Sequence, residues 1–254
     1  MNINHAQLEI AGESNVGLTR RHNEDNFLIY APPDGDGVLA VVADGIGGHS
    51  RGEAASYICC RELFQAARQC RSWDKDFLHR TLTLANRTIF DFNFKGKRIR
   101  PMGCTVVAAL FFRDRVICAH AGDSRMYVFA RSAENTPLRQ LTVDHRPEGY
   151  EDLRSAGKLT STNLVSRSLG TAKYLEIDLQ ELPRPENARY LLCSDGLYNR
   201  LPDQLLSGLL GSDLSARQIT GQLLRGALLA GERDNITVIC ATPLRKEKPE
   251  NGSA

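Results

Sequence analysis

Five short apolar stretches of this chain begin or end close to an aspartate. These aspartates are Asp25, Asp44, Asp123, Asp195 and Asp234. Because apolar runs of this length are typical of buried strands, each carboxylate is predicted to lie where a strand meets the edge of a sheet. Carboxylates gathered at one edge repel each other strongly unless cations lie among them. The pattern therefore constrains the chain to a fold that brings several strand ends together around bound cations.

The ligand types predict hard divalent ions. Carboxylates without paired Cys or His residues select Mg²⁺ or Mn²⁺, and the sequence has neither a C-x-x-C pair nor an H-E-x-x-H zinc motif. Asp44 is the best bridge between two ions, because a glycine follows it and leaves the carbonyl of either Asp44 or Gly45 free to approach an ion. Asp25, Asp195 and Asp234 would supply the flanking ligands. A water between two such ions would lose its proton near neutral pH and attack a phosphorus atom in line.

A substrate phosphate also needs a fixed cation, and Arg20, a few residues before Asp25, can bind two phosphate oxygens with its planar guanidinium. Other phosphatase chemistries lack their residues. No cysteine is followed by five residues and an arginine, and neither an Asp-x-Asp-x-Thr nor a G-x-x-x-x-G-K-[ST] motif is present. A single aspartate is often only a turn or cap residue, but the recurrence of four strand-end acids plus an arginine favours a metal-dependent phosphatase.

Hydrophobic periodicity predicts an α+β fold with antiparallel sheets. Strands are expected at residues 8–11, 27–30, 38–43, 104–112, 115–121, 125–130, 175–182, 188–193 and 236–241. Helices are expected at residues 53–70, 76–92 and 214–230, the last capped by Ser212 or Asp213 and stopped by Gly231. Turns at 113–114 and 122–124 predict that three consecutive strands form an antiparallel meander. We expect a single domain over residues 1–244 and a disordered polar tail at 245–254.

Composition excludes several classes of protein. A formal net charge of +2 in 254 residues gives no electrostatic footprint for nucleic acid or an anionic membrane. The longest apolar run, residues 104–112, is too short to span a bilayer, and the first residues do not resemble an export signal. The seven cysteines are odd in number and lie mostly in apolar runs, which is typical of reduced, buried thiols. These features predict a cytoplasmic protein.

Eight short motifs occur in an order that resembles the PPM (type 2C) metal-dependent protein serine/threonine phosphatases in their bacterial form. They are Gly17-x-x-Arg20-x-x-Asn23-Glu24-Asp25, Asp44-Gly45-Ile46-Gly47-Gly48-His49, Gly103-Cys104-Thr105, Gly122-Asp123-Ser124-Arg125, Leu141-Thr142-x-Asp144-His145, Ser166-Arg167-Ser168-Leu169-Gly170, Ser194-Asp195-Gly196-Leu197 and Asp234-Asn235-Ile236-Thr237. The resemblance covers residues 8 to 242. It implies an α-β-β-α sandwich in which two packed antiparallel sheets are flanked by helix pairs, with the metals in a cleft at one end.

The resemblance also implies roles for the site residues. Asp44 would bridge two metal ions and the Gly45 carbonyl would bind one of them. Asp25 would serve that ion, partly through water, while Asp195 and Asp234 would hold the other. Arg20 would bind the substrate phosphate. Asp123, together with Asp195, matches a third, weaker metal site of bacterial members.

Four positions depart from the family pattern. Ile46 stands where eukaryotic members carry a histidine that is the proposed general acid, and isoleucine cannot donate a proton. The nearby His49 is better interpreted as an ordinary loop residue. The segment 146–165 corresponds to a mobile flap; it is shorter than usual and begins with Arg146-Pro147 where many bacterial members have a serine. Thr171 replaces a common aspartate. Flap length is expected to affect substrate choice and occupancy of the third metal site.

These observations predict an enzyme that hydrolyses phosphoserine and phosphothreonine in proteins with Mn²⁺ or Mg²⁺, through a metal-bridging water or hydroxide. Its partners would be phosphorylated proteins and a cognate serine/threonine kinase system. One alternative is a catalytically weak pseudo-phosphatase that acts as a regulatory binding module, against which the complete ligand set and Arg20 argue. Another is a two-metal phosphoesterase acting on nucleotides or nucleic acid, which the near-neutral charge disfavours.

Overall fold

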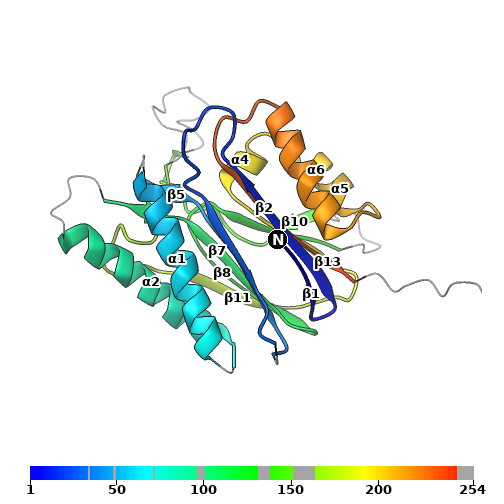
Figure 1. Cartoon of the computed structure of the whole chain (residues 1–254), viewed down its shortest axis with the longest axis horizontal. Coiled ribbons are helices and arrows are strands. Elements are labelled where there is room, and N and C mark those ends of the chain that lie inside the picture. Colours follow the sequence, from blue (N-terminus) through cyan, green and yellow to red (C-terminus); the bar gives the residue numbers. More distant parts are fainter. Residues whose placement is uncertain are drawn as a thin grey trace, which may run out of the picture.

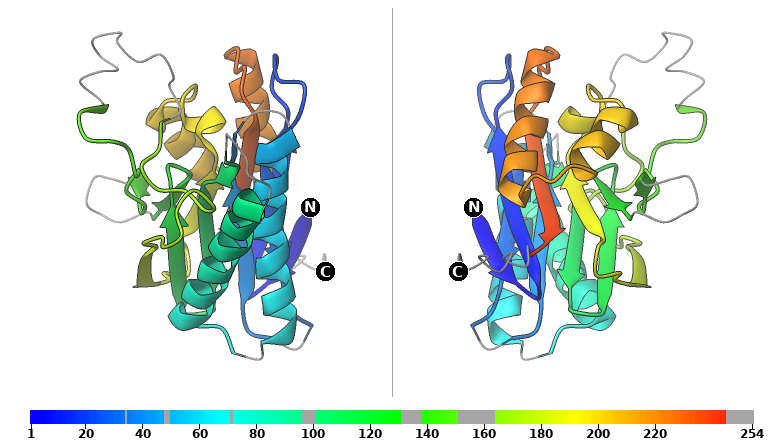
Figure 2. Two further views of the ribbon diagram at one scale, coloured as in Figure 1. Left: turned by 90° about the vertical axis from the view of Figure 1, so that its left-hand side faces the viewer. Right: turned by 90° about the vertical axis from the view of Figure 1, so that its right-hand side faces the viewer.

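The computed structural model describes residues 1–33, 35–47, 50–70, 72–95, 101–130, 138–150 and 164–244. In this part of the chain two antiparallel β-sheets pack face to face, and helices cover the outer face of each sheet (Figures 1 and 2). The predicted α+β fold, an α-β-β-α sandwich, is confirmed. His49, most of the flap (151–163) and the tail (245–254) lie outside the described residues.

The first sheet has six strands, and helices α4 (Asp195–Tyr198), α5 (Asp203–Leu210) and α6 (Ala216–Leu229) lie beside it. Its strands, in spatial order, are β1 (Asn2–His5), β2 (Leu8–Asn15), β13 (Ile236–Pro243), β12 (Arg189–Cys193), β9 (Arg125–Phe129) and β10 (Leu138–Gln140).

The second sheet has five strands and packs against helices α1 (Ser50–Gln69) and α2 (Lys75–Lys95). Its spatial order is β11 (Asp178–Pro183), β8 (Arg115–Ala121), β7 (Val106–Phe111), β4 (Val38–Ala43) and β3 (Asn26–Tyr30). A two-stranded ribbon of β5 (Gly45–Ile46) and β6 (Gly103–Cys104) follows the end of β4.

Strands β4 and β7 are apolar throughout because both of their faces are buried. In β4, Leu39 and Val41 pack under the helices while Ala40 and Val42 pack between the sheets. Side chains alternate between the two faces of a strand, so a strand covered on both sides has no position that faces water. The aspartates stand where such strands begin or end.

The predicted meander is wrong at its third strand. Strands β7 and β8 pair as expected, but β9 pairs with β12 in the other sheet. The chain changes sheets at Gly122, which has φ +112°, a value that favours glycine. The Gly122 amide donates to Nδ1 of His145 at 3.1 Å, and its carbonyl accepts from the His145 amide at 2.9 Å. These two bonds hold the crossover and place Asp123 between the ends of both sheets.

The other predicted strands and helices are present with changed boundaries. The predicted strand at 104–112 is interrupted at Thr105, where β6 ends and β7 begins. The predicted cap of the last helix is wrong: Ser215, and not Ser212 or Asp213, caps α6, through a capping box in which Ser215 and Gln218 each bond the other's backbone amide. Gly231, with φ +82°, ends this helix as predicted.

No helix among the described residues has the length and hydropathy needed to cross a bilayer.

Candidate metal centre

A cavity of about 190 Å³ lies where β4, β8 and β12 end and β13 begins. Four of the five predicted aspartates line it, and Asp25 lies behind them at 5% exposure. The lining residues are Arg20, Glu24, Asp44, Gly45, Ile46, Gly47, Thr105, Asp123, Val165, Asp195, Asp234 and Asn235. Residues that are far apart in the sequence thus form one strongly acidic site.

Asp25 has one carboxylate oxygen that is fixed and one that is unsatisfied. Its Oδ2 accepts hydrogen bonds from Oγ of Ser194 at 2.8 Å and from Oγ1 of Thr237 at 2.7 Å. Its Oδ1 is buried and has no hydrogen-bond partner among the described residues. Burial raises the pKa of Asp25 to about 6, although the two hydroxyls oppose the shift. A buried carboxylate oxygen without a donor is the atom that a cation would satisfy.

The other carboxylates repel one another. Burial raises the pKa of Asp44 well above its ordinary value, and repulsion by Asp25, Asp195, Asp123 and Asp234 adds to the shift. Burial likewise raises the pKa of Asp195, with further repulsion from Asp123 and Asp234. Divalent cations would remove this repulsion, because an opposite charge favours the ionised form. The oxygen-only donor set and its excess negative charge fit hard divalent ions such as Mg²⁺ and Mn²⁺.

The turn after β4 restricts which carbonyl can reach an ion. The Asp44 carbonyl accepts the Thr105 amide at 2.8 Å, so of the two carbonyls considered from the sequence, that of Gly45 is the better candidate. A side chain at Gly45 would have no room, since a Cβ there would lie 2.3 Å from the Gly52 carbonyl atoms and 2.5 Å from the Glu24 carbonyl oxygen. The first turn of α1 is therefore packed directly against the loop that follows Asp44.

Arg20 lies at the rim of the cavity. Its Nη2 atom is 2.8 Å from Oδ2 of Asp234, and its side chain is 45% exposed. The pair fixes the guanidinium beside the carboxylates while leaving it accessible to a ligand that enters from solvent.

Sequence reasoning assigned no role to Asn235, which organises the loop that carries Arg20 and Asp25. Its Oδ1 accepts the Glu24 amide at 2.8 Å, and its Nδ2 donates to the Val16 and His22 carbonyls at 2.9 and 3.1 Å. The sequence signals for this residue are its position directly after a strand-end aspartate and its place in the motif Asp234-Asn235-Ile236-Thr237. Ser194 and Thr237 also stand in two of the motifs, but nothing in the sequence shows which way their hydroxyls point.

A second group of side chains, His120, His145 and Asp178, has potential ligand atoms within 4.8 Å of one another. Nδ1 of His145 accepts the Gly122 amide, so the ring proton must lie on Nε2, which is 3.3 Å from Oδ2 of Asp178. A metal on Nε2 would need that position deprotonated and Nδ1 protonated against an amide donor. The group is therefore better described as a hydrogen-bonded cluster than as a metal site.

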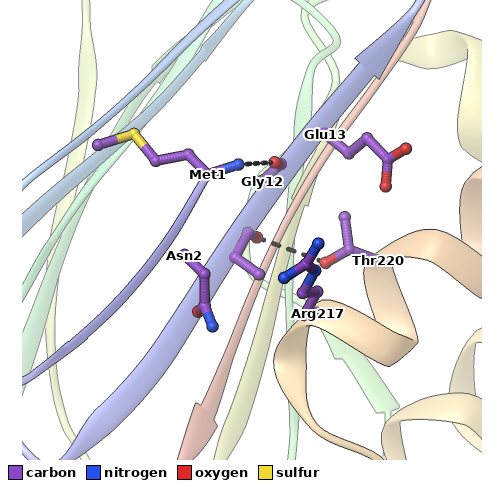
Figure 3. A pocket seen from close by; sticks show the side chains of 7 residues that line it. Met1, Asn2, Gly12, Glu13, Arg217 and Thr220 are labelled. Atoms are coloured by element: carbon purple, nitrogen blue, oxygen red, sulfur yellow. Dashed lines mark hydrogen bonds between the residues drawn. The ribbon is translucent and has the colours of Figure 1, made fainter.

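A larger cavity of about 350 Å³ lies between the start of the chain, β2 and α6 (Figure 3). There the Met1 ammonium group donates to the Gly12 carbonyl at 3.0 Å, and Thr220 donates to the Ala11 carbonyl at 3.4 Å. Glu13 and Arg217 also line this cavity. Charges of both signs are present, so this cavity lacks the concentration of carboxylates that marks the smaller one.

A two-sheet sandwich with clustered carboxylates and an arginine at one end is suited to metal-dependent hydrolysis of phosphate esters. The family model described as protein phosphatase 2C matches residues 19–217. A serine/threonine phosphatase, stp, of Listeria monocytogenes is 31% identical over 240 residues, which are 88% of this chain and 91% of the relative.

Two solved structures agree with these matches. The serine/threonine phosphatase of S. agalactiae superposes with a TM-score of 0.80 at 28% identity, covering 92% of this chain and 99% of that one. The catalytic domain of the phosphatase PstP, in complex with 2 manganese ions, gives a TM-score of 0.77 at 31% identity, covering 92% and 97%. The chain belongs to the protein phosphatase 2C family. It is therefore a metal-dependent protein serine/threonine phosphatase, and the alternative of a non-catalytic binding module is not supported.

Proposed function

We propose that this protein removes phosphate from phosphoserine and phosphothreonine in proteins, with two divalent ions, Mn²⁺ or Mg²⁺, in the acidic cavity. The observation that carries the proposal is the unsatisfied, buried Oδ1 of Asp25 within a cluster of mutually repelling carboxylates beside Arg20. The two manganese ions of PstP, a structure with the same fold, support it.

The ligand roles proposed here are those that the family resemblance implies, and the position of the carboxylates is compatible with them. Asp44 would bridge the two ions, because it interacts with the carboxylates on every side of the cavity. Asp195 and Asp234 would hold one ion, and Asp25 with the Gly45 carbonyl the other. When bound, the ions would lower the pKa of a water molecule and withdraw charge from the substrate phosphate.

The remaining chemistry belongs to side chains at the rim. Arg20 would bind two phosphate oxygens and orient the phosphorus atom, while Asp234 keeps the guanidinium in place. Ile46 lines the cavity but cannot transfer a proton, so the departing serine or threonine oxygen would receive its proton from water or from another group.

The proposed substrates imply a partner enzyme and a compartment. A phosphatase for phosphoserine and phosphothreonine would oppose a serine/threonine kinase. We place both in the cytoplasm, a reducing compartment that suits the seven free cysteines of this chain. Residues 1–244 would form one catalytic domain, because a single apolar cluster contains residues of both sheets.

The test is release of phosphate from a phosphothreonine peptide in Mn²⁺, in EDTA, and by the Asp195→Asn variant in Mn²⁺. We expect turnover with metal, none with chelator, and a loss of at least about 100-fold in the variant, because a metal ligand is removed. Asp213→Asn, an exposed carboxylate near α6, is the matched control and should retain wild-type activity. Metal-independent turnover, or wild-type rates for Asp195→Asn, would overturn the mechanism. Peptide binding without turnover would favour a binding module.

A further inference from the structure

The side chain of Arg146 is a nearly buried cation at the edge of the acidic cavity. Its Nη2 lies 3.0 Å from Oδ2 of Asp123, and the two side chains are only 9% and 4% exposed. The same Nη2 donates to the Tyr198 hydroxyl at 3.1 Å, and Nε lies 3.3 Å from Oδ2 of Asp144. The guanidinium also lies over the ring of Tyr150, 4.4 Å from its centroid. Contacts on several sides fix this group against Asp123.

The partners of Arg146 are themselves held in place. Asp144 receives two hydrogen bonds from Arg125, at 2.9 and 2.8 Å. The Tyr198 hydroxyl donates to the Asp123 carbonyl at 3.0 Å, and Arg125 stacks on the Tyr198 ring at 3.5 Å. The position of the guanidinium is therefore determined by the protein and needs no bound ion.

The charges of the cavity are balanced without a third ion. Six carboxylates gather there, those of Glu24, Asp25, Asp44, Asp123, Asp195 and Asp234. Two divalent ions would supply four positive charges, and the guanidinium groups of Arg20 on Asp234 and Arg146 on Asp123 supply the other two. A further divalent ion on Asp123 would be repelled by the neighbouring guanidinium, and would have to displace a charge that has little access to water.

We propose that the guanidinium of Arg146 is a built-in cation that occupies Asp123, excludes a third divalent ion, and limits this protein to two. The proposal rests on the proposed two-ion centre and concerns the residue that departs from the serine of many bacterial relatives. Asp123 becomes a metal ligand only when Arg146 is removed. The same contact attaches the beginning of the flap segment to the metal centre.

The test is the number of Mn²⁺ ions bound per chain, measured by electron paramagnetic resonance of free Mn²⁺ and by titration calorimetry. We expect two ions for the wild type and three for Arg146→Ser, the third binding more weakly. Arg146→Lys keeps the positive charge and should stay at two. The double variant Arg146→Ser/Asp123→Asn should return to two, because the new site loses its carboxylate.

Two further variants make the result specific. Arg167→Ser removes an arginine just beyond the flap segment, where it pairs with Glu176 and Asp178 at 2.8 Å, and this variant should still bind two ions. Asp123→Asn in the wild-type background should also stay at two, which tests the proposal even if Arg146→Ser fails to fold by circular dichroism. Three ions bound by the wild type would overturn this proposal and leave the proposed function standing. Loss of an ion from Asp123→Asn, or only two ions bound by a folded Arg146→Ser, would do the same. Absence of Mn²⁺ binding by the wild type would instead overturn the proposed function, and this inference with it.

Discussion

At the scale of single residues, the metal centre depends on hydroxyl groups that hold a carboxylate in one orientation. The Oδ2 atom of Asp25 accepts hydrogen bonds from Ser194 and Thr237, and this leaves Oδ1 for the cavity. Both hydroxyls are fully buried. Neither touches the cavity, so they act on the reaction only through Asp25.

Thr237→Val should therefore weaken metal binding more than it weakens the fold. A hydrogen bond to a charged group contributes about 1.5–3 kcal/mol, so the Mn²⁺ dissociation constant should rise by about tenfold or more. Calorimetric titration with Mn²⁺ measures this change. Thr242→Val, a buried threonine on the same strand away from the site, is the control and should leave Mn²⁺ affinity unchanged. Equal effects of the two variants would show that Thr237 has only a structural role.

His120 should make the protein less stable in mild acid. Burial is the main reason that its pKa lies below the ordinary 6.5, and the positive form of His145 would lower it further, while the Val143 carbonyl, Asp178 and Asp144 oppose the shift. A histidine whose folded-state pKa is lowered is protonated more readily in the unfolded chain. The contribution of neutral His120 to the free energy of unfolding is therefore complete above pH 6.5. It is lost as pH falls from there through the folded-state pKa of His120.

The measurement compares thermal unfolding of wild type and His120→Gln between pH 7.5 and 5.5. Glutamine can still donate to the Val143 carbonyl but does not titrate, so the advantage of the wild type should shrink as pH falls from 7.5 to 5.5. His79→Gln, at an exposed position of α2, should follow the wild type at every pH. A constant difference between wild type and His120→Gln across this range would contradict the assignment.

At the scale of elements, the sequence predicts what depends on local pattern. Strand β4 is recognisable because both of its faces are buried, and the aspartate that follows it stands out for the same reason. The sheet to which β9 belongs is not readable, since the crossover depends on hydrogen bonds between Gly122 and the distant His145. The cap of α6 was misplaced because three candidate residues stand within one turn, and only Ser215 has Gln218 at the correct spacing for a capping box.

In the candidate metal centre too, features that depend on local sequence pattern were predictable and contacts between distant residues were not. Strand ends mark the carboxylates, so the aspartates could be chosen from the sequence, and the structure brings them to one cavity. The supporting contacts could not be chosen, because the partners of Asn235, just before β13, and of Thr237, within it, are fixed only when the loop that carries Asp25 packs against them. The contact between Arg146 and Asp123 joins residues whose neighbours give no sign of it.

The junction of β5 with α1 gives a prediction about packing between elements. Gly45→Ala would place a methyl group 2.3 Å from backbone atoms of Gly52, so α1 or the loop that follows Asp44 must move. We expect destabilisation of about 1–3 kcal/mol by denaturant unfolding, together with loss of phosphatase activity.

Gly208→Ala is the matched control, because this glycine is exposed on α5 and nothing lies within 4 Å of the added Cβ. There alanine should stabilise the protein by about 0.5–1 kcal/mol and leave activity intact, since it only lowers the entropy of the unfolded chain. Wild-type stability and activity in Gly45→Ala would refute the close packing at this junction.

At the scale of the whole molecule, the carboxylates of the candidate metal centre come from both sheets. Asp44 follows a strand of the five-stranded sheet, while Asp195 and Asp234 flank strands of the six-stranded sheet. Ions bound by all three would link the layers at the end where the carboxylates otherwise repel. Metal binding should therefore stabilise the fold as a whole, in addition to enabling the reaction.

Mn²⁺ should raise the thermal unfolding temperature of the intact chain. A ligand that binds only the folded state, at a free concentration of 100 times its dissociation constant, stabilises it by about 2.7 kcal/mol, which corresponds to roughly 5 to 10 °C for a chain of this size. Calorimetric melts in EDTA and in rising Mn²⁺, at constant ionic strength, measure the effect. Asp44→Asn, which removes the bridging carboxylate, should melt at a higher temperature than wild type in EDTA, because one repelling charge is gone, and should gain much less from Mn²⁺. An unfolding temperature that did not respond to Mn²⁺ in the wild type would show that the ions do not link the two sheets.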